Sequence, residues 1–254
     1  NNINKCNDNR AEHEATFSCK TYEMKDGSKK QEWHYGFRAH IICDAKYGLP
    51  IKSKVTPANN SEQTELDNLL KEMQNNDKEQ YKLKKMKNLM GDAGYDNGSR
   101  NKRIKEEYNV NPIIDIVHRW DKTEKYREIE NQPIAYTEEG EVFYIVDLNN
   151  YEKMKYLGYA GYDKENKALR YGRYTKGKKV YRVPLSTDYR IFTPVARDSK
   201  KFKKKYKMRT EIERLNGRID RDYMFNDHFI RGQKKMELML NLTFIVMLTI
   251  AKGH

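Results

Sequence analysis

Two short stretches carry residue types that could do chemistry. Asp92 lies between glycines at the end of an apolar run, as expected where a buried strand opens onto a functional loop. In the second stretch, residues 206–221, Tyr206, Arg209 and Glu213 fall on one stripe of a helix that turns about 100° per residue. Carboxylates are the ligands that hard divalent cations prefer, and an arginine can clamp a phosphate with two donors. The alternative for the second stretch is a solvated face with ion pairs such as Arg209 with Glu213.

Both stretches need elements that position them. The helix over 206–221 has a second, apolar stripe that should pack on a core, formed by Met208, Ile212, Leu215 and Ile219. Around Asp92 the sequence alternates between strand and helix patterns. Strands are expected over 33–44, 51–58 and 111–117, and a further strand is expected to end at residue 92. Helices are expected over 62–74 and 99–108. This alternation predicts a mixed α/β sheet.

Together the two stretches resemble the DDE-type transposases of bacterial insertion sequences, in the group with a Tyr-x2-Arg-x3-Glu-x6-Lys signature. Tyr206, Arg209 and Glu213 match this signature at the right spacing, whereas the closing Lys position is Asp220, a departure. Further matches follow in order: Tyr35-Gly36-Phe37-Arg38-Ala39-His40, Thr56-Pro57-Ala58-Asn59, Gly91-Asp92-Ala93-Gly94-Tyr95-Asp96, Arg231-Gly232 and Lys235-Met236. The resemblance spans residues 30 to 116 and 190 to 250.

The resemblance implies an RNase H-like sheet flanked by helices, in which carboxylates from distant parts of the chain hold two Mg²⁺ ions. Asp92 and Glu213 match the last two members of the carboxylate triad, so we expect them to be catalytic and to bind the metal, with Mn²⁺ as a substitute. The implied reaction is Mg²⁺-dependent cleavage and strand transfer of DNA at insertion-sequence ends. Tyr206 and Arg209 would contact that DNA. The implied partners are transposon-end and target DNA and a second copy in a synaptic homodimer, at a nucleoid-associated location in the bacterial cytoplasm.

The first Asp of the triad has no convincing match. Asp8 lies in a polar stretch, and Asp26 lies in a turn. Asp44 ends a strand that should run antiparallel to the one ending at Asp92, which places it about a strand length from the site. We therefore expect the chain to be the C-terminal portion of a longer transposase, with the first Asp upstream, and expect it not to cleave DNA alone.

The charge balance points to a polyanionic partner. Lys and Arg number 50 against 37 Asp and Glu, for a net charge of +13, which favours nucleic acid or an anionic membrane surface. A lysine run precedes Tyr206. Such a run is usually solvated, but one turn ahead of Glu213 it favours phosphate contact. The lysines expected to bind DNA are Lys201, Lys203, Lys204, Lys205 and Lys207.

Residues 118–195 differ from the rest, because Tyr and Lys dominate and short alternating runs predict strands at 141–147, 168–174, 180–183 and 189–191. In the family that the chain resembles, an insertion at this point helps to hold the DNA ends; the alternative is a structural flap. We expect three segments: a first part of the core over 1–117, a β-rich insertion over 118–195, and the C-terminal helices of the core over 196–254.

Other classes of site are disfavoured. The three cysteines, at positions 6, 19 and 43, support neither a disulfide framework nor a zinc site. The most apolar segment, 236–251, is broken by Glu237 and Asn241 and is too short for a membrane span, so we expect a buried helix and no membrane partner. Two other functions remain open. One is a metal-dependent nuclease of the same fold without strand transfer, and the other is a noncatalytic DNA-binding domain.

Overall fold

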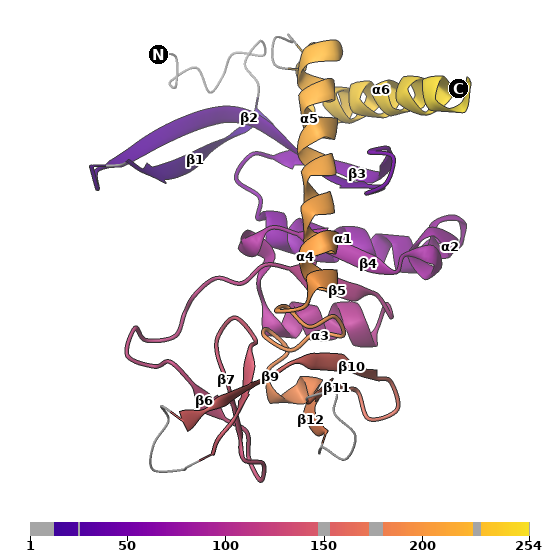
Figure 1. The fold of residues 1–254 in the computed structure, drawn as a ribbon. Helices are drawn as coiled ribbons and strands as arrows, with labels where there is room; N and C mark the ends of the chain where they lie inside the picture. Colours follow the sequence, from indigo (N-terminus) through magenta and orange to yellow (C-terminus); the bar gives the residue numbers. More distant parts are fainter. Residues whose placement is uncertain (1–12, 25, 147–152, 173–179, 226–229, 254) are drawn as a thin grey trace. The chain divides into compact units, whose positions relative to one another are not determined.

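The computed structural model describes residues 13–24, 26–146, 153–172, 180–225 and 230–253 (Figure 1). The chain divides into two compact units, one formed by residues 1–72 and 210–254 and the other by residues 73–209. Within the described ranges the strands form four sheets, interspersed with helices, so the fold is mixed α/β as the sequence predicts. The three-segment boundaries, and the joining of the core strands into one RNase H-like sheet, stay predictions.

The first unit is built on an antiparallel sheet in the order β1-β2-β3. Its strands are β1 (Thr16–Glu23), β2 (Lys29–Cys43) and β3 (Pro50–Pro57). The second half of β2 pairs with β3 from Phe37 opposite Pro57 to Cys43 opposite Pro50, which confirms the predicted hairpin. The first half of β2 pairs with β1, and the two form a ribbon that extends past β3 in Figure 1.

Three helices accompany this sheet: α1 (Glu62–Asn75), which begins in the first unit, α5 (Thr210–Asp222) and α6 (Gln233–Gly253). The apolar stripe of α5 is confirmed at Leu215 and Ile219, which are buried with Val55 and one face of α6. The residues of that α6 face are Met236, Leu240, Phe244 and Met247.

The expectation of a buried C-terminal helix is wrong for the opposite face of α6. That face carries exposed apolar side chains: Leu238, Met239, Leu242, Ile245, Val246, Leu248 and Ile250. At 21 residues α6 is long and apolar enough to cross a membrane, contrary to the length expected from the sequence. By length and composition alone this is weak evidence, because core helices of soluble proteins pass the same test.

The second unit begins with α2 (Asp77–Lys85), β4 (Asn88–Gly91), the 3₁₀ turn η1 (Ala93–Tyr95), α3 (Gly98–Glu106) and β5 (Asn111–Ile114). The strands β4 and β5 pair in parallel. The charged linker expected before β4 is instead the helix α2, whose first turn is capped by the Asn76 side chain. Asn97 rather than Ser99 caps α3, and β5 ends at Ile114 rather than at residue 117.

The same unit continues with antiparallel strands: β6 (Arg127–Glu128), β7 (Ile134–Tyr136), β8 (Val142–Tyr144), β9 (Lys155–Leu157), β10 (Tyr159–Asp163), β11 (Ala168–Tyr171) and β12 (Tyr181–Pro184). Three of the expected strands correspond to β8, β11 and β12, although residues 147 and 173–174 lie outside the described ranges. The strand expected at 189–191 is a turn, which follows the 3₁₀ turn η3 (Leu185–Thr187). Tyr136, Leu169, Tyr171 and Phe192 are at the centre of the core of these strands.

The helix expected over 206–221 is not a continuous α-helix. Its residues belong to α4 (Lys200–Tyr206), the 3₁₀ turn η4 (Lys207–Arg209) and α5. Because a 3₁₀ turn winds more tightly than an α-helix, it interrupts the α-helical period between Tyr206 and Glu213. Met208, expected on the buried stripe, lies in this turn and is 38% exposed.

Candidate active site

Two aspartates follow the ends of the parallel strands β4 and β5. Gly91 pairs with Ile114 in this ladder, and Asp92 and Asp115 are the next residues on their strands. Neighbouring strands lie about 4.8 Å apart, so both carboxylates leave the same edge of the pair. Asp92 is exposed and Asp115 is half-buried. Asp115 is absent from the sequence-based site, although its apolar run ending in Asp repeats the pattern that precedes Asp92.

The loop after β4 fixes one oxygen of Asp92. Its Oδ1 atom accepts a hydrogen bond of 2.9 Å from the Gly94 amide, which caps η1. A Cβ atom at position 94 would lie 3.0 Å from the same oxygen, closer than ordinary van der Waals contact. The glycine therefore lets the backbone approach the carboxylate, which explains why the apolar run ends in Gly-Asp-Ala-Gly.

The helix α4 places Tyr206 beside these two aspartates. The Phe202 and Tyr206 rings are stacked with centroids 6.1 Å apart, and both pack with Ile113 of β5. Burial raises the pKa of the Tyr206 hydroxyl, and the negative charges of Asp115 and Asp92 raise it further. Both carboxylates are thus close enough to act on the same phenol, so this edge of the second unit gathers all three side chains.

Arg209, at the end of η4, belongs to the same group. Its guanidinium carbon lies 5.7 Å from the centroid of the Tyr206 ring, within the range of a cation–π contact. The positive charge of Arg209 also lowers the pKa of the Tyr206 hydroxyl, although less than burial and Asp115 raise it. The structure therefore brings Tyr206 and Arg209 together, and the charge of Asp92 acts on the Tyr206 hydroxyl, while the roles of these residues in a DNA site stay a prediction.

The lysine run lies along α4 and η4. Lys201, Lys203, Lys204 and Lys207 are exposed, and Lys205 is half-buried. Burial lowers the pKa of Lys205, and the nearby charges of Lys201 and Lys87 lower it further. These cations repel one another, and a bound anion would relieve that repulsion.

Glu213 lies in the first turn of α5 and is exposed. It belongs to the first unit and Asp92 to the second, so their meeting at one metal site stays a prediction. Glu211 has a different role, because it forms an ion pair with Arg214 and lies beside Gly48 in the turn before β3.

The aspartates considered for the first carboxylate are used in turns. The Oδ1 atom of Asp26 accepts hydrogen bonds from the Ser28 amide at 2.9 Å and from its hydroxyl at 2.6 Å. The Oδ1 atom of Asp44 accepts from the amides of Lys46 and Tyr47. Asp8 lies outside the described residues. Neither Asp26 nor Asp44 is therefore placed like the Asp92 and Asp115 pair.

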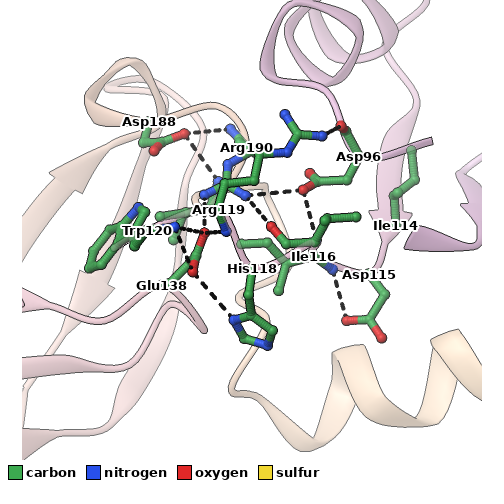
Figure 2. Close-up of polar contacts among 12 residues, drawn as sticks. Asp96, Ile114, Asp115, Ile116, His118, Arg119, Trp120, Glu138, Asp188 and Arg190 are labelled. Atoms are coloured by element: carbon green, nitrogen blue, oxygen red, sulfur yellow. Dashed lines mark hydrogen bonds and ion pairs between the residues drawn. The ribbon is translucent and has the colours of Figure 1, made fainter. Parts of the chain in front are cut away.

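A buried ion-pair network lies behind the Asp92 loop (Figure 2). Asp96 is 1% exposed, and its Oδ2 atom accepts from Arg190 Nη1 at 3.2 Å and from the Val117 amide at 3.0 Å. The other terminal nitrogen of Arg190 donates to Glu138 Oε1 at 2.5 Å. Glu138 also accepts from the Arg119 amide at 2.7 Å. Asp115 points away from this network in Figure 2, so the two groups of carboxylates have different surroundings.

A family model described as Transposase DDE domain matches residues 10–249, nearly the whole chain. The chain belongs to this transposase family. No solved structure matches it. Membership implies a function in DNA transposition, DNA as a partner and polynucleotidyl transfer as the class of reaction.

DDE transposases typically use a divalent metal, and the donor set here can be compared with that need. In the described part of the chain, no three His, Cys, Asp or Glu side chains gather as a metal-binding group. Mg²⁺ keeps several waters and is usually bound through one or two carboxylates plus substrate phosphate. Asp92 and Asp115 on one strand edge fit that requirement in number and in chemistry.

Proposed function

We propose that this chain is the catalytic domain of an insertion-sequence transposase, which cleaves DNA and transfers strands in a Mg²⁺-dependent reaction on an RNase H-like scaffold. One observation carries the proposal: Asp92 lies at the carboxyl edge of the parallel β4–β5 pair, next to Asp115 and Tyr206. Family membership covers nearly all of the chain and supports the same class of reaction.

The residues of the site have separate roles in this proposal. Asp92 and Glu213 would hold the divalent ions, and Asp115 lies where it can add a carboxylate oxygen or orient a metal-bound water. When bound, the ions activate the attacking oxygen and stabilise the leaving 3′ oxygen. Mg²⁺ is the expected ion, and Mn²⁺ can take its place.

Tyr206 and Arg209 would hold the DNA strand at the reacting phosphate. A tyrosine hydroxyl keeps its proton at neutral pH, the raised pKa of Tyr206 acts in the same direction, and the hydroxyl can therefore donate a hydrogen bond to a phosphate oxygen. Arg209 can donate two hydrogen bonds to the same group. The lysines of α4 would bind the phosphates that flank it, through release of counterions. The wider assembly, a homodimer on transposon-end and target DNA in the bacterial cytoplasm, belongs to the same proposal.

Metal binding by the purified chain tests the site directly. Titration with Mn²⁺, followed by calorimetry or electron paramagnetic resonance, should show binding that Asp92→Asn weakens by about tenfold or more, because a ligand is lost. DNA affinity at low salt should stay within about twofold of wild type, since the lysines are unchanged. Equal Mn²⁺ affinity in wild type and Asp92→Asn would remove Asp92 from the metal site.

Transposition in cells tests the reaction. Glu213→Gln should abolish excision and joining of the insertion sequence, whereas Glu211→Gln, on the same helix, serves as a matched control and should retain both. Cleavage without joined products would support the nuclease alternative. Joining at the wild-type level in Glu213→Gln would contradict the proposed role of this residue.

A further inference from the structure

The buried network reaches both aspartates of the candidate site through the backbone. Asp96 follows Asp92 by four residues, and its amide donates to the Ala93 carbonyl at 3.0 Å across η1. On the other strand, the Arg197 guanidinium donates to the carbonyl of Ile114, the residue before Asp115. The end of β5 is thus held by the Arg197 side chain, whereas the turn after β4 is closed by the backbone amide of Asp96.

The buried members of the network are balanced in charge. Its members are two carboxylates and two guanidiniums, all at most 11% exposed: Asp96, Glu138, Arg190 and Arg197. The second oxygen of Asp96 lies 3.8 Å from Arg197 Nη2, and Arg197 Nη2 also donates to the Arg190 carbonyl at 2.5 Å. The charges of these four side chains compensate one another, and their hydrogen bonds also reach the surrounding backbone.

Most hydrogen bonds of the network join its charged side chains to backbone amides and carbonyls rather than to other side chains. Arg190 Nη1 donates to the Val117 carbonyl at 2.6 Å, and Arg119 Nη2 donates to the Asp96 carbonyl at 2.8 Å. The segment that leaves β5 is therefore tied to the loop that leaves β4. When hydrogen bonds that hold a ligand-bearing loop are removed, the loop can move. Small shifts of a carboxylate then change the coordination geometry of the metal.

We propose that Asp96 is a positioning residue, which fixes the Asp92 loop against Arg190 and Arg197 and so sets the direction of the Asp92 carboxylate. For its effect on the metal, this inference rests on the proposed function of Asp92. Its geometric part does not, because the hydrogen bond from the Gly94 amide to Asp92 Oδ1 reports on the carboxylate in the absence of any metal.

The experiment compares Asp96→Asn with a matched control in the same unit. Asparagine keeps the size of the side chain and removes its charge. The control is Asp163→Asn in β10, whose Oδ2 atom accepts from Arg182 Nε at 3.1 Å in another ion pair. For each protein, hydrogen exchange of the Gly94 amide and Mn²⁺ affinity are measured at a temperature at which both variants are fully folded.

Asp96→Asn should speed exchange of the Gly94 amide about tenfold or more and weaken Mn²⁺ binding about ten- to a hundredfold. Asp163→Asn should leave both values near wild type. A lower melting temperature in Asp96→Asn with unchanged Gly94 exchange would overturn the inference, since the network would then serve stability alone. Absence of Mn²⁺ binding in wild type would instead contradict the proposed function, and Gly94 exchange would still decide the positioning role.

Discussion

The roles of Asp92 and Gly94 explain why the loop after β4 has the sequence Gly-Asp-Ala-Gly. Asp92 has to cap η1 and still offer a carboxylate to the edge of β4, and Gly94 makes that possible by lacking a side chain. The sequence alone indicates Asp92, Tyr206 and Arg209 as candidate site residues, and in the structure Arg209 lies against Tyr206 while the charge of Asp92 acts on the Tyr206 hydroxyl. The sequence analysis did not include Asp115, although Asp115 follows an apolar run as Asp92 does, because only the parallel pairing of β4 with β5 in the folded chain brings the two aspartates to one edge.

Gly94→Ala should therefore damage the site without unfolding the protein. The added Cβ atom would lie 3.0 Å from Asp92 Oδ1 and push the carboxylate away from its present place. We expect Mn²⁺ affinity to fall about tenfold while far-ultraviolet circular dichroism stays unchanged. Gly98→Ala is the control, because its Cβ atom would have an ordinary contact of 3.5 Å. Equal losses in both variants would argue against a specific effect on Asp92.

Asp115→Asn tests the carboxylate that the sequence reading missed. If Asp115 acts on the same ion as Asp92, the substitution should weaken Mn²⁺ binding by a smaller factor than Asp92→Asn. It should also lower the pKa of Tyr206, because a negative charge next to the phenol is removed. Ultraviolet titration of the tyrosines, with Tyr206→Phe to assign the signal, measures that change. An unchanged pKa would place Asp115 outside the site.

Elements with a strong periodic pattern were predictable, and elements fixed by tertiary contacts were not. The β2–β3 hairpin, α1, β4 and α3 follow from apolar spacing, turn residues and caps. The helix α2 was missed because charged residues dominate it, so it has little apolar period to recognise. The 3₁₀ turn η4 was missed because nothing in its residues, Lys207–Arg209, breaks a helix.

The helix α4 should supply much of the salt-dependent affinity for DNA. Replacing Lys203, Lys204 and Lys205 together by Ala should weaken binding and flatten the dependence of log K on log salt by up to about three units. The control replaces three lysines in the last turn of α2: Lys82, Lys84 and Lys85. Fluorescence anisotropy at several salt concentrations measures both. Unchanged binding by the α4 variant at every salt concentration would exclude this run as a DNA contact.

At the scale of the whole molecule, the sequence indicated a mixed α/β protein and its family, which the family match confirms. The three expected segments stay a prediction, and the chain divides into compact units at residues 72/73 and 209/210. The strands over 127–184 and the β4–β5 pair belong to one unit. Long-range ion pairs such as Asp96 with Arg190 join them, and pairs separated by 94 residues are not visible in a local pattern.

The free energy of unfolding should depend on pH because the buried network contains Glu138, a carboxylate with a lowered pKa. Burial raises the pKa of Glu138, but hydrogen bonds from Arg190 and from the Arg119 and Trp120 amides outweigh it and hold the pKa at about 2. A lowered pKa means that this stabilisation is complete above pH 4.5 and is lost as the pH falls towards 2. The loss amounts to about 3 kcal/mol for a shift of this size.

Urea unfolding at a series of pH values measures this loss. Glu138→Gln should be less stable than wild type at pH 6 and should have a flatter dependence between pH 4.5 and 2. Glu139→Gln is the matched control, because its side chain is 58% exposed and adjacent in sequence. Parallel curves for wild type and Glu138→Gln would show that Glu138 contributes little to this loss.

The position of Arg190, one of the two arginines that face Asp96, has a practical consequence for protein engineering. Arg190 and Glu138 come from the β-rich part of the chain, whereas Asp96 follows β4. Excising that part to obtain a minimal domain would remove Arg190, the arginine that hydrogen-bonds the buried Asp96 carboxylate, and breaking a buried pair in this way costs about 3–5 kcal/mol. Exchange of the β-rich part between related transposases should therefore succeed when the donor carries equivalents of both Arg190 and Glu138, and should give insoluble protein when it lacks them.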